Sequence, residues 1–115
     1  MIAKIYHNTR CSKSRATLAI LEQNNVEFEI VAYLENPPSE SELRSVLQDL
    51  GIGARDLIRK GESTYKDLQL SNQSLTEDEL IKAMLNYPIL IERPIVRTTK
   101  GVVIGRPPEN VQSIL

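Results

Sequence analysis

The sequence predicts an α/β fold: a four-stranded mixed sheet with a helical insertion between the second and third strands. Short apolar runs of strand length lie near both ends of the chain, and a helical pattern follows the first of them. Between them, residues 39–87 show helical periodicity and turn signals but no strand pattern. A chain of 115 residues is large enough for one domain with its own core, so a single domain over residues 1–115 is predicted.

The first part of the chain predicts a βαβ unit. A strand over residues 2–6 is followed by a helix over 12–24 and by a second strand in which apolar residues alternate from Phe28 to Leu34. A crossover helix between two strands so close in sequence makes those strands parallel. The buried stripe of the helix is predicted from its apolar side chains, Leu18 and Leu21 widened by Ala16, Ala19 and Ile20.

The insertion contains two helices that begin at capping boxes, where Ser or Thr is followed three residues later by Glu: Ser39 with Glu42, and Thr76 with Glu79. Gly51 is predicted to end the first in the left-handed conformation, and Pro88 ends the second. A shorter helix is expected over residues 54–60, with one further turn before residue 74.

Strands return over residues 94–98 and 101–105, joined by a short turn that contains Gly101, and a short helix closes the chain. The order β-α-β, helices, β-β-α is that of a thioredoxin-like fold with a helical insertion. A different small α/β sandwich is the alternative that this order leaves open.

Cys11, the only cysteine, falls between the first strand and the first helix. Free backbone N–H groups and the positive end of the helix dipole favour negative charge there, and Arg10, Lys13 and Arg15 add cationic charge. A pKa below the ordinary value of about 8.5, and hence a reactive thiolate, is expected. A small buried structural cysteine is the alternative interpretation.

Composition excludes several functional classes. A single cysteine cannot form an intramolecular disulfide, and a working thiolate needs a reducing compartment, so a cytoplasmic protein is expected. The net charge of −1 argues against nucleic-acid or membrane partners, and no apolar run approaches 18 residues. One Cys and one His are too few for a typical zinc site, so no metal and no bound cofactor are predicted.

Three arginines lie at boundaries of predicted elements: Arg59, Arg93 and Arg106. Antiparallel pairing brings together the start of one hairpin strand and the end of its partner, and hence Arg93 and Arg106. Two converging guanidinium groups would hold an oxyanion between them. A salt bridge to Glu92, or plain exposure to solvent, is the alternative.

The chain resembles the glutaredoxin-linked arsenate reductases, and looks closer to a shorter chromosomal branch of that family than to the plasmid-type enzymes. The resemblance covers essentially the whole chain and includes the spacing His-x3-Cys-x3-Arg. The matching segments are Ile5-Tyr6-His7-Asn8 with Cys11 and Ser14-Arg15, Tyr33-Leu34-Glu35-Asn36-Pro37-Pro38, Ile58-Arg59-Lys60, Pro88 to Val96, and Arg106-Pro107.

This resemblance implies a thioredoxin-like oxidoreductase in which Cys11 attacks arsenate. It implies that the oxyanion and the arsenic adduct are bound by Arg59, Arg93 and Arg106. His7 would tune the thiol, Ser14 would lie close to it, and the bond Arg93–Pro94 would be cis. Because the chain has no second cysteine, an external thiol must resolve the adduct, and the family uses glutathione followed by glutaredoxin.

Three other functions compete with arsenate reduction. Redox regulators of this fold bind RNA polymerase and switch through a Cys-x-x-Cys pair, but the second position here is Ser14. A phosphatase with the Cys-x5-Arg motif would need Arg where the chain has Thr17. A monothiol protein that handles glutathione without reducing arsenate is the main alternative.

Overall fold

The computed structural model describes residues 2–115 and divides them into two compact units. The first unit contains the described residues up to Asn36 together with Arg93–Leu115, and the second contains Pro37–Glu92. Each unit is described by itself, and the single domain over residues 1–115 stays a prediction. In the described part of the chain, no helix has the length and apolar character needed to cross a lipid bilayer.

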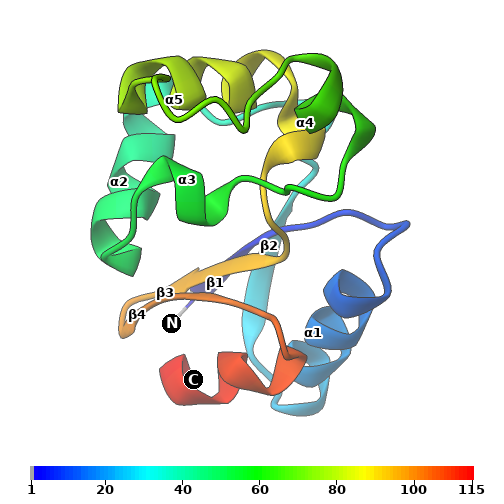
Figure 1. Cartoon of the computed structure of the whole chain (residues 1–115). Helices are drawn as coiled ribbons and strands as arrows, with labels where there is room; N and C mark the ends of the chain where they lie inside the picture. Colours follow the sequence, from blue (N-terminus) through cyan, green and yellow to red (C-terminus); the bar gives the residue numbers. More distant parts are fainter. Residues whose placement is uncertain (1) are drawn as a thin grey trace. The chain divides into compact units, whose positions relative to one another are not determined.

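The first unit is built on a four-stranded sheet (Figure 1). Its strands are β1 (Ile2–Tyr6), β2 (Glu27–Val31), β3 (Ile95–Thr98) and β4 (Gly101–Ile104), in the order β2-β1-β3-β4. The pair β1–β2 is parallel, whereas β1–β3 and β3–β4 are antiparallel. The predicted mixed sheet, with parallel first strands and an antiparallel final hairpin, is confirmed.

The second strand is shorter than predicted. It ends at Val31, where the amide of Tyr33 donates to the Val31 carbonyl at 2.9 Å and the amide of Glu35 donates to the Ala32 carbonyl at 3.0 Å. The chain therefore turns before Leu34, although the apolar alternation continues to that residue. Alternation reports which residues suit a strand, but the local hydrogen bonds decide where the strand stops.

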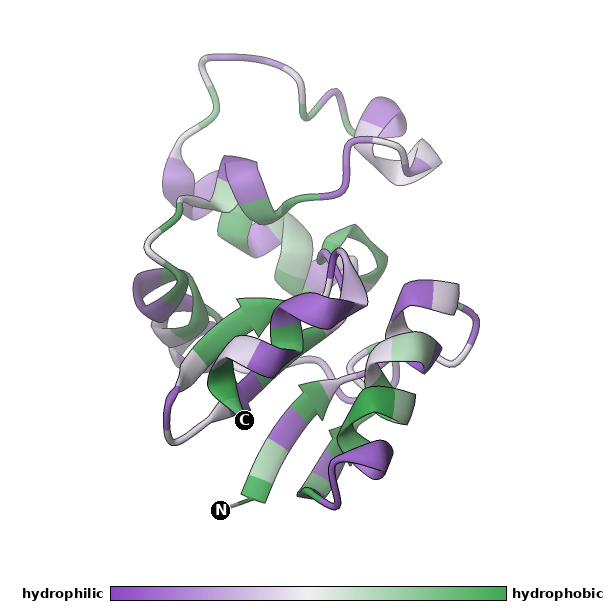
Figure 2. Ribbon diagram, turned by 90° about the horizontal axis from the view of Figure 1, so that it is seen from below, coloured by the Kyte–Doolittle hydropathy of each residue, from purple (hydrophilic) through white to green (hydrophobic). Residues whose placement is uncertain are grey.

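Helix α1 (Ser12–Gln23) and the 3₁₀ helix η2 (Pro108–Ile114) cover one face of this sheet. In Figure 2 the apolar colours are concentrated on the strands, while the helices carry both apolar and polar residues. The buried cluster between sheet and helices consists of Ala3, Ile5, Leu21, Val96, Val111 and Ile114. The closing helix is thus confirmed, although it has 3₁₀ geometry.

The predicted buried stripe of α1 is partly wrong. The buried residues are Ser14, Thr17 and Leu21, whereas Leu18 and Ile20 are only half-buried, and two alanines of the predicted stripe, Ala16 and Ala19, are exposed. Two of the three buried side chains are polar, so apolar periodicity could not identify this face. Both polar groups are hydrogen-bonded, which removes most of the cost of burying them: Ser14 contacts the imidazole of His7, and Thr17 donates to the Lys13 carbonyl at 2.9 Å.

The second unit is helical. It contains α2 (Glu40–Leu50), α3 (Ala54–Leu57), α4 (Ser63–Asp67), α5 (Glu77–Asn86) and the 3₁₀ turn η1 (Pro88–Leu90). Gly51 follows α2 with a φ of 70°, as predicted for a left-handed helix end. The third helix stops at Leu57, three residues before its predicted end. Ile58 instead forms an antiparallel bridge with Ile91, and the amide of Arg59 donates to the Leu90 carbonyl at 2.7 Å.

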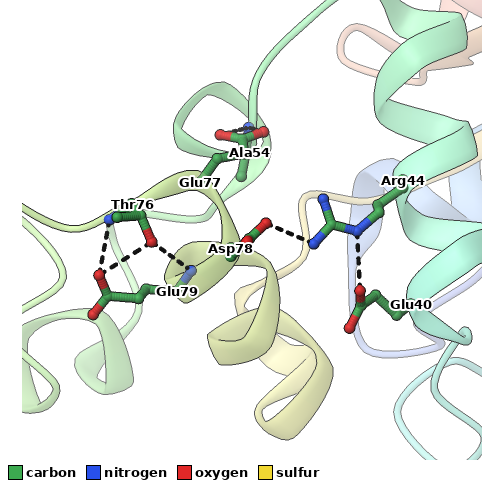
Figure 3. Close-up of polar contacts among 7 residues, drawn as sticks. All are labelled: Glu40, Arg44, Ala54, Thr76, Glu77, Asp78 and Glu79. Atoms are coloured by element: carbon green, nitrogen blue, oxygen red, sulfur yellow. Dashed lines mark hydrogen bonds and ion pairs between the residues drawn. The ribbon is translucent and has the colours of Figure 1, made fainter.

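Side chains near the start of α5 tie the second unit together (Figure 3). The complete capping box of Thr76 and Glu79 is confirmed, while at α2 the cap bond from the Glu42 amide to Ser39 is observed. The Glu77 carboxylate accepts the amide of Ala54 at 2.9 and 3.1 Å and so satisfies the first free N–H of α3. Arg44 on α2 binds Glu40 and also reaches Asp78 on α5, at 3.1 and 2.7 Å.

Replacing Thr76 with Ala should lower the free energy of unfolding by about 1 kcal/mol, because the variant loses the two bonds of the Thr76 hydroxyl, which accepts from the Glu79 amide and donates to the Glu79 carboxylate. Urea titration followed by circular dichroism measures this loss. Ser71→Ala is the matched control: Ser71 is exposed, so its substitution should change stability by less than about 0.5 kcal/mol. Equal stability of the two variants would contradict the cap assignment.

Candidate functional site

The site is centred on Cys11, which occupies the N-cap position of α1 with extended backbone angles of φ −94° and ψ 120°. Its amide donates to the Asn8 carbonyl at 3.0 Å, and its carbonyl accepts the amide of Arg15 at 3.0 Å. The first bond closes the turn after β1, and the second begins the helix. The side chain is half-buried and its thiol is free. The predicted strand-to-helix turn is therefore confirmed.

The surroundings of Cys11 favour its thiolate. Burial alone would raise the pKa of the thiol, but four groups together outweigh burial and hold it below its ordinary value. The backbone N–H groups of Ser14 and Lys13 face the sulfur, the Arg106 charge attracts it, and the Arg93 guanidinium donates to it. These are the effects expected where helix amides and cations converge on one atom.

Two of the three predicted oxyanion-binding arginines converge on this sulfur. The Arg106 Nη2 atom lies 3.3 Å from Cys11 Sγ, and its Nε donates to the Arg93 carbonyl at 2.8 Å. The Arg93 side chain is itself buried. The bond Arg93–Pro94 is cis, as predicted, and Arg106–Pro107 is also cis, which was not predicted. The hairpin thus brings the two arginines together, as its antiparallel pairing implied, and the structure places them at the thiol.

Arg59 has a different setting. It belongs to the second unit, where its guanidinium forms ion pairs with Glu62 at 3.1 Å and with Glu92 at 2.7 Å. Glu92, considered from sequence as a partner for Arg93 and Arg106, is therefore bound by the third arginine of the predicted set. The role of Arg59 in oxyanion binding stays a prediction.

His7 and Ser14 contact each other next to the Cys11 turn. The His7 Nδ1 and Ser14 Oγ atoms are 2.5 Å apart, and the same hydroxyl accepts the amide of Asn8 at 3.1 Å. Burial, and next to it the Arg15 charge, lower the pKa of His7, so the imidazole is neutral at neutral pH. His7 therefore does not act on the thiol as a cation. Its contact is with Ser14, whose own amide faces the sulfur.

Asn8 is a site residue that sequence reasoning missed. It is buried, and it holds the turn through three bonds: its amide to Ser14, its carbonyl to the Cys11 amide, and its Oδ1 to the Arg10 amide at 2.9 Å. A side-chain oxygen that accepts an amide two residues on is the Asx turn typical of asparagine. Asn two residues after the end of a strand and three residues before the thiol was the signal available in the sequence.

Together these groups can bind an anion beside a nucleophile. The guanidinium groups of Arg93 and Arg106 offer planar N–H donors, and the first turn of α1 offers free amides. The thiolate would attack an electrophilic centre held between them. Within residues 2–115, no cluster of three His, Cys, Asp or Glu side chains could hold a metal ion.

Alkylation should report the activated thiol directly. The rate of reaction with iodoacetamide, followed against pH, should reach half its plateau at a lower pH for Cys11 than for N-acetylcysteine amide measured alongside, because the helix amides and Arg106 stabilise the thiolate. A midpoint at or above that of the model thiol would contradict the electrostatic assignment.

Comparisons with known proteins agree with this geometry. The model of the ArsC family matches residues 6–114. The uncharacterized protein YfgD of Escherichia coli K12 is 52% identical over 97% of this chain and 95% of its own length. An arsenate reductase of Neisseria meningitidis serogroup A is 44% identical over 97% of both chains. The solved structure of an arsenate reductase from Vibrio cholerae superposes with a TM-score of 0.96, at 46% identity, over 100% of this chain and 98% of its own.

Proposed function

Because the chain belongs to the ArsC family, we propose that it is an oxidoreductase that reduces arsenate to arsenite. The observation that carries the proposal is the contact of Arg106 with the sulfur of Cys11, at 3.3 Å, beside the buried Arg93. A thiolate that attacks an arsenate dianion must approach like charge. Two guanidinium groups at the sulfur offset this repulsion and remain charged throughout the reaction.

In the first step the Cys11 sulfur forms a bond to arsenic, and one As–O bond breaks as a hydroxyl group of the arsenate takes a proton from solvent and leaves as water. The product is a thiol–arsenate ester in which arsenic is not yet reduced. Arg93 and Arg106 would bind the remaining oxygens, and the amides of Lys13 and Ser14 stabilise the thiolate before attack. Arg59 is proposed as a third ligand of the oxyanion, on the resemblance of Ile58-Arg59-Lys60 to the family.

An external thiol must complete the reaction because Cys11 is the only cysteine. We assign that role to glutathione, with glutaredoxin as the protein that resolves the resulting adduct. Overall, arsenate and two thiols give arsenite, a disulfide and water, so arsenic gains the two electrons that the thiols lose. Both partners and the covalent adduct fit a reducing compartment such as the cytoplasm.

A coupled assay tests the proposal. Purified protein, glutathione, glutaredoxin, glutathione reductase and NADPH are mixed, and NADPH oxidation is followed after arsenate is added. Arsenate-dependent oxidation is expected, and phosphate in place of arsenate should give none because phosphorus is not reduced by thiols. If this protein, in a mixture without glutaredoxin, drives NADPH oxidation with a glutathione mixed disulfide but the complete mixture shows none with arsenate, the monothiol alternative is favoured instead. Separate omission of glutaredoxin and of glutathione tests each partner.

A further inference from the structure

Gly105 lies where two parts of the candidate site touch. It directly follows β4 and precedes Arg106, and it is buried. A Cβ atom at this position would lie 2.5 Å from Thr17 Oγ1, 3.2 Å from Thr17 Cγ2 and 2.8 Å from the Cγ of Pro94. Distances below 3.0 Å are closer than side-chain atoms approach, so the backbone at Gly105 contacts α1 more closely than any other residue type would allow.

Neither neighbour of Gly105 can easily move aside. Thr17 is fully buried, and its hydroxyl is fixed by donation to the Lys13 carbonyl at 2.9 Å. Pro94 has a rigid ring, and its carbonyl accepts the amide of Gly105 at 2.8 Å. The contact therefore fixes the distance between helix α1 and the end of the hairpin.

The same two segments meet a second time at the thiol. Arg106, the residue after Gly105, reaches Cys11 Sγ, and Cys11 precedes Thr17 by six residues on the same helix, roughly 9 Å along its axis. Because the helix is stiff, a shift at Thr17 is carried to the N-cap. Arg106 is also bonded to the Arg93 carbonyl, so both arginines belong to the segment that Gly105 holds.

We propose that Gly105 and Thr17 are positioning residues, whose close contact sets the distance between the Cys11 sulfur and the guanidinium groups of Arg93 and Arg106. This inference deepens the proposed function and rests on it for the role of the arginines as oxyanion ligands. Neither Gly105 nor Thr17 takes part in the reaction itself, but their contact influences the reactivity of the Cys11 thiol.

Gly105→Ala is the test. The added methyl group should push the hairpin end away from α1, so the attraction of Arg106 for the thiolate weakens. The midpoint of the thiol alkylation profile should rise by about half to one pH unit, and kcat/KM for arsenate should fall about tenfold, mainly through a higher KM. Thr17→Ala combined with Gly105→Ala removes two of the three crowded atoms and should restore part of the wild-type thiol midpoint.

Two controls separate positioning from packing. Gly53→Ala places a methyl group no closer than 3.6 Å to a neighbour and should leave the thiol midpoint unchanged. Leu21→Val acts in the core on the same face of α1, and should lower stability without moving that midpoint. A Gly105→Ala protein with a wild-type thiol midpoint, or a double variant in which the two effects simply add, would overturn the proposal.

Two further outcomes keep the proposal and the proposed function distinct. If Gly105→Ala does not fold, Thr17→Ala alone is measured. It should raise the midpoint of the thiol alkylation profile, because the segment that carries Arg106 then loses its close contact with α1. An unchanged midpoint would refute positioning. Alkylation needs no arsenate. A shifted midpoint in a protein without arsenate-dependent NADPH oxidation would therefore support positioning while refuting the reductase.

Discussion

Cys11→Ser should abolish arsenate-dependent NADPH oxidation, with a loss of more than about 10³-fold, while the protein stays folded. The serine hydroxyl ionises far above neutral pH, so the groups that favour a thiolate at this position cannot produce an alkoxide nucleophile. The side chain is only half-buried at a helix N-cap, so the substitution removes little from the core.

Circular dichroism and urea titration check the fold of this variant, and the coupled assay measures its turnover. Wild-type protein alkylated with iodoacetamide provides an independent comparison, because it carries the same backbone and a blocked sulfur. Both preparations should be inactive. Turnover close to wild type in the serine variant would remove Cys11 from the role of nucleophile.

Arg106→Lys should lower kcat/KM for arsenate by about 10- to 100-fold, which corresponds to about 1.5–3 kcal/mol for one lost charged hydrogen bond. Lysine keeps the charge but has one ammonium group in place of the planar fork. It cannot reach the Cys11 sulfur and the Arg93 carbonyl with separate nitrogens, as Arg106 does. The alkylation midpoint of the thiol should rise as well. Arg93→Lys is expected to give a loss of the same order.

Arg44→Lys is the matched control for charge and size. Arg44 is exposed and bridges Glu40 and Asp78, and such surface ion pairs are screened by solvent and contribute little to stability. Its substitution should leave the kinetics unchanged. Indistinguishable kinetics for Arg44→Lys and Arg106→Lys would mean that the arginine at the thiol does not bind the substrate. Arg59→Lys in the same assay tests whether the arginine paired with Glu62 and Glu92 belongs to the oxyanion site.

Elements with strong local signals were predictable from sequence. Three features depend only on a few neighbouring residues: the capping box at Thr76, the left-handed Gly51 and the Gly-containing hairpin turn. The local sequence pattern is therefore enough to identify each of them. The position of Cys11 at the start of α1 was predictable for the same reason. Pairing of Arg93 with Arg106 followed from antiparallel geometry once the hairpin had been identified.

Features that depend on contacts across the fold were not predictable. The buried face of α1 carries Ser14 and Thr17, which are acceptable there only because His7 and the Lys13 carbonyl satisfy them. The early end of α3 depends on pairing of Ile58 with Ile91, a residue far away in sequence. The ion pair of Arg59 with Glu92 has the same origin. Periodicity describes one segment at a time and contains no information about such partners.

At the N-cap of α1, the residue needed as the nucleophile is not the residue that stabilises the helix best. Serine is among the best N-cap residues, whereas Cys11 caps α1 without a side-chain hydrogen bond. The inactive serine protein should therefore be the more stable one at acidic pH, where the thiol is neutral. As the pH rises through the lowered pKa of Cys11, the thiolate gains from the helix amides, and that gain is complete above the pKa of the unfolded thiol. The difference in the free energy of unfolding between the two proteins should narrow over this range. Cys11 is therefore a poor helix cap as the neutral thiol, but it stabilises the helix as the thiolate, which is also the nucleophile.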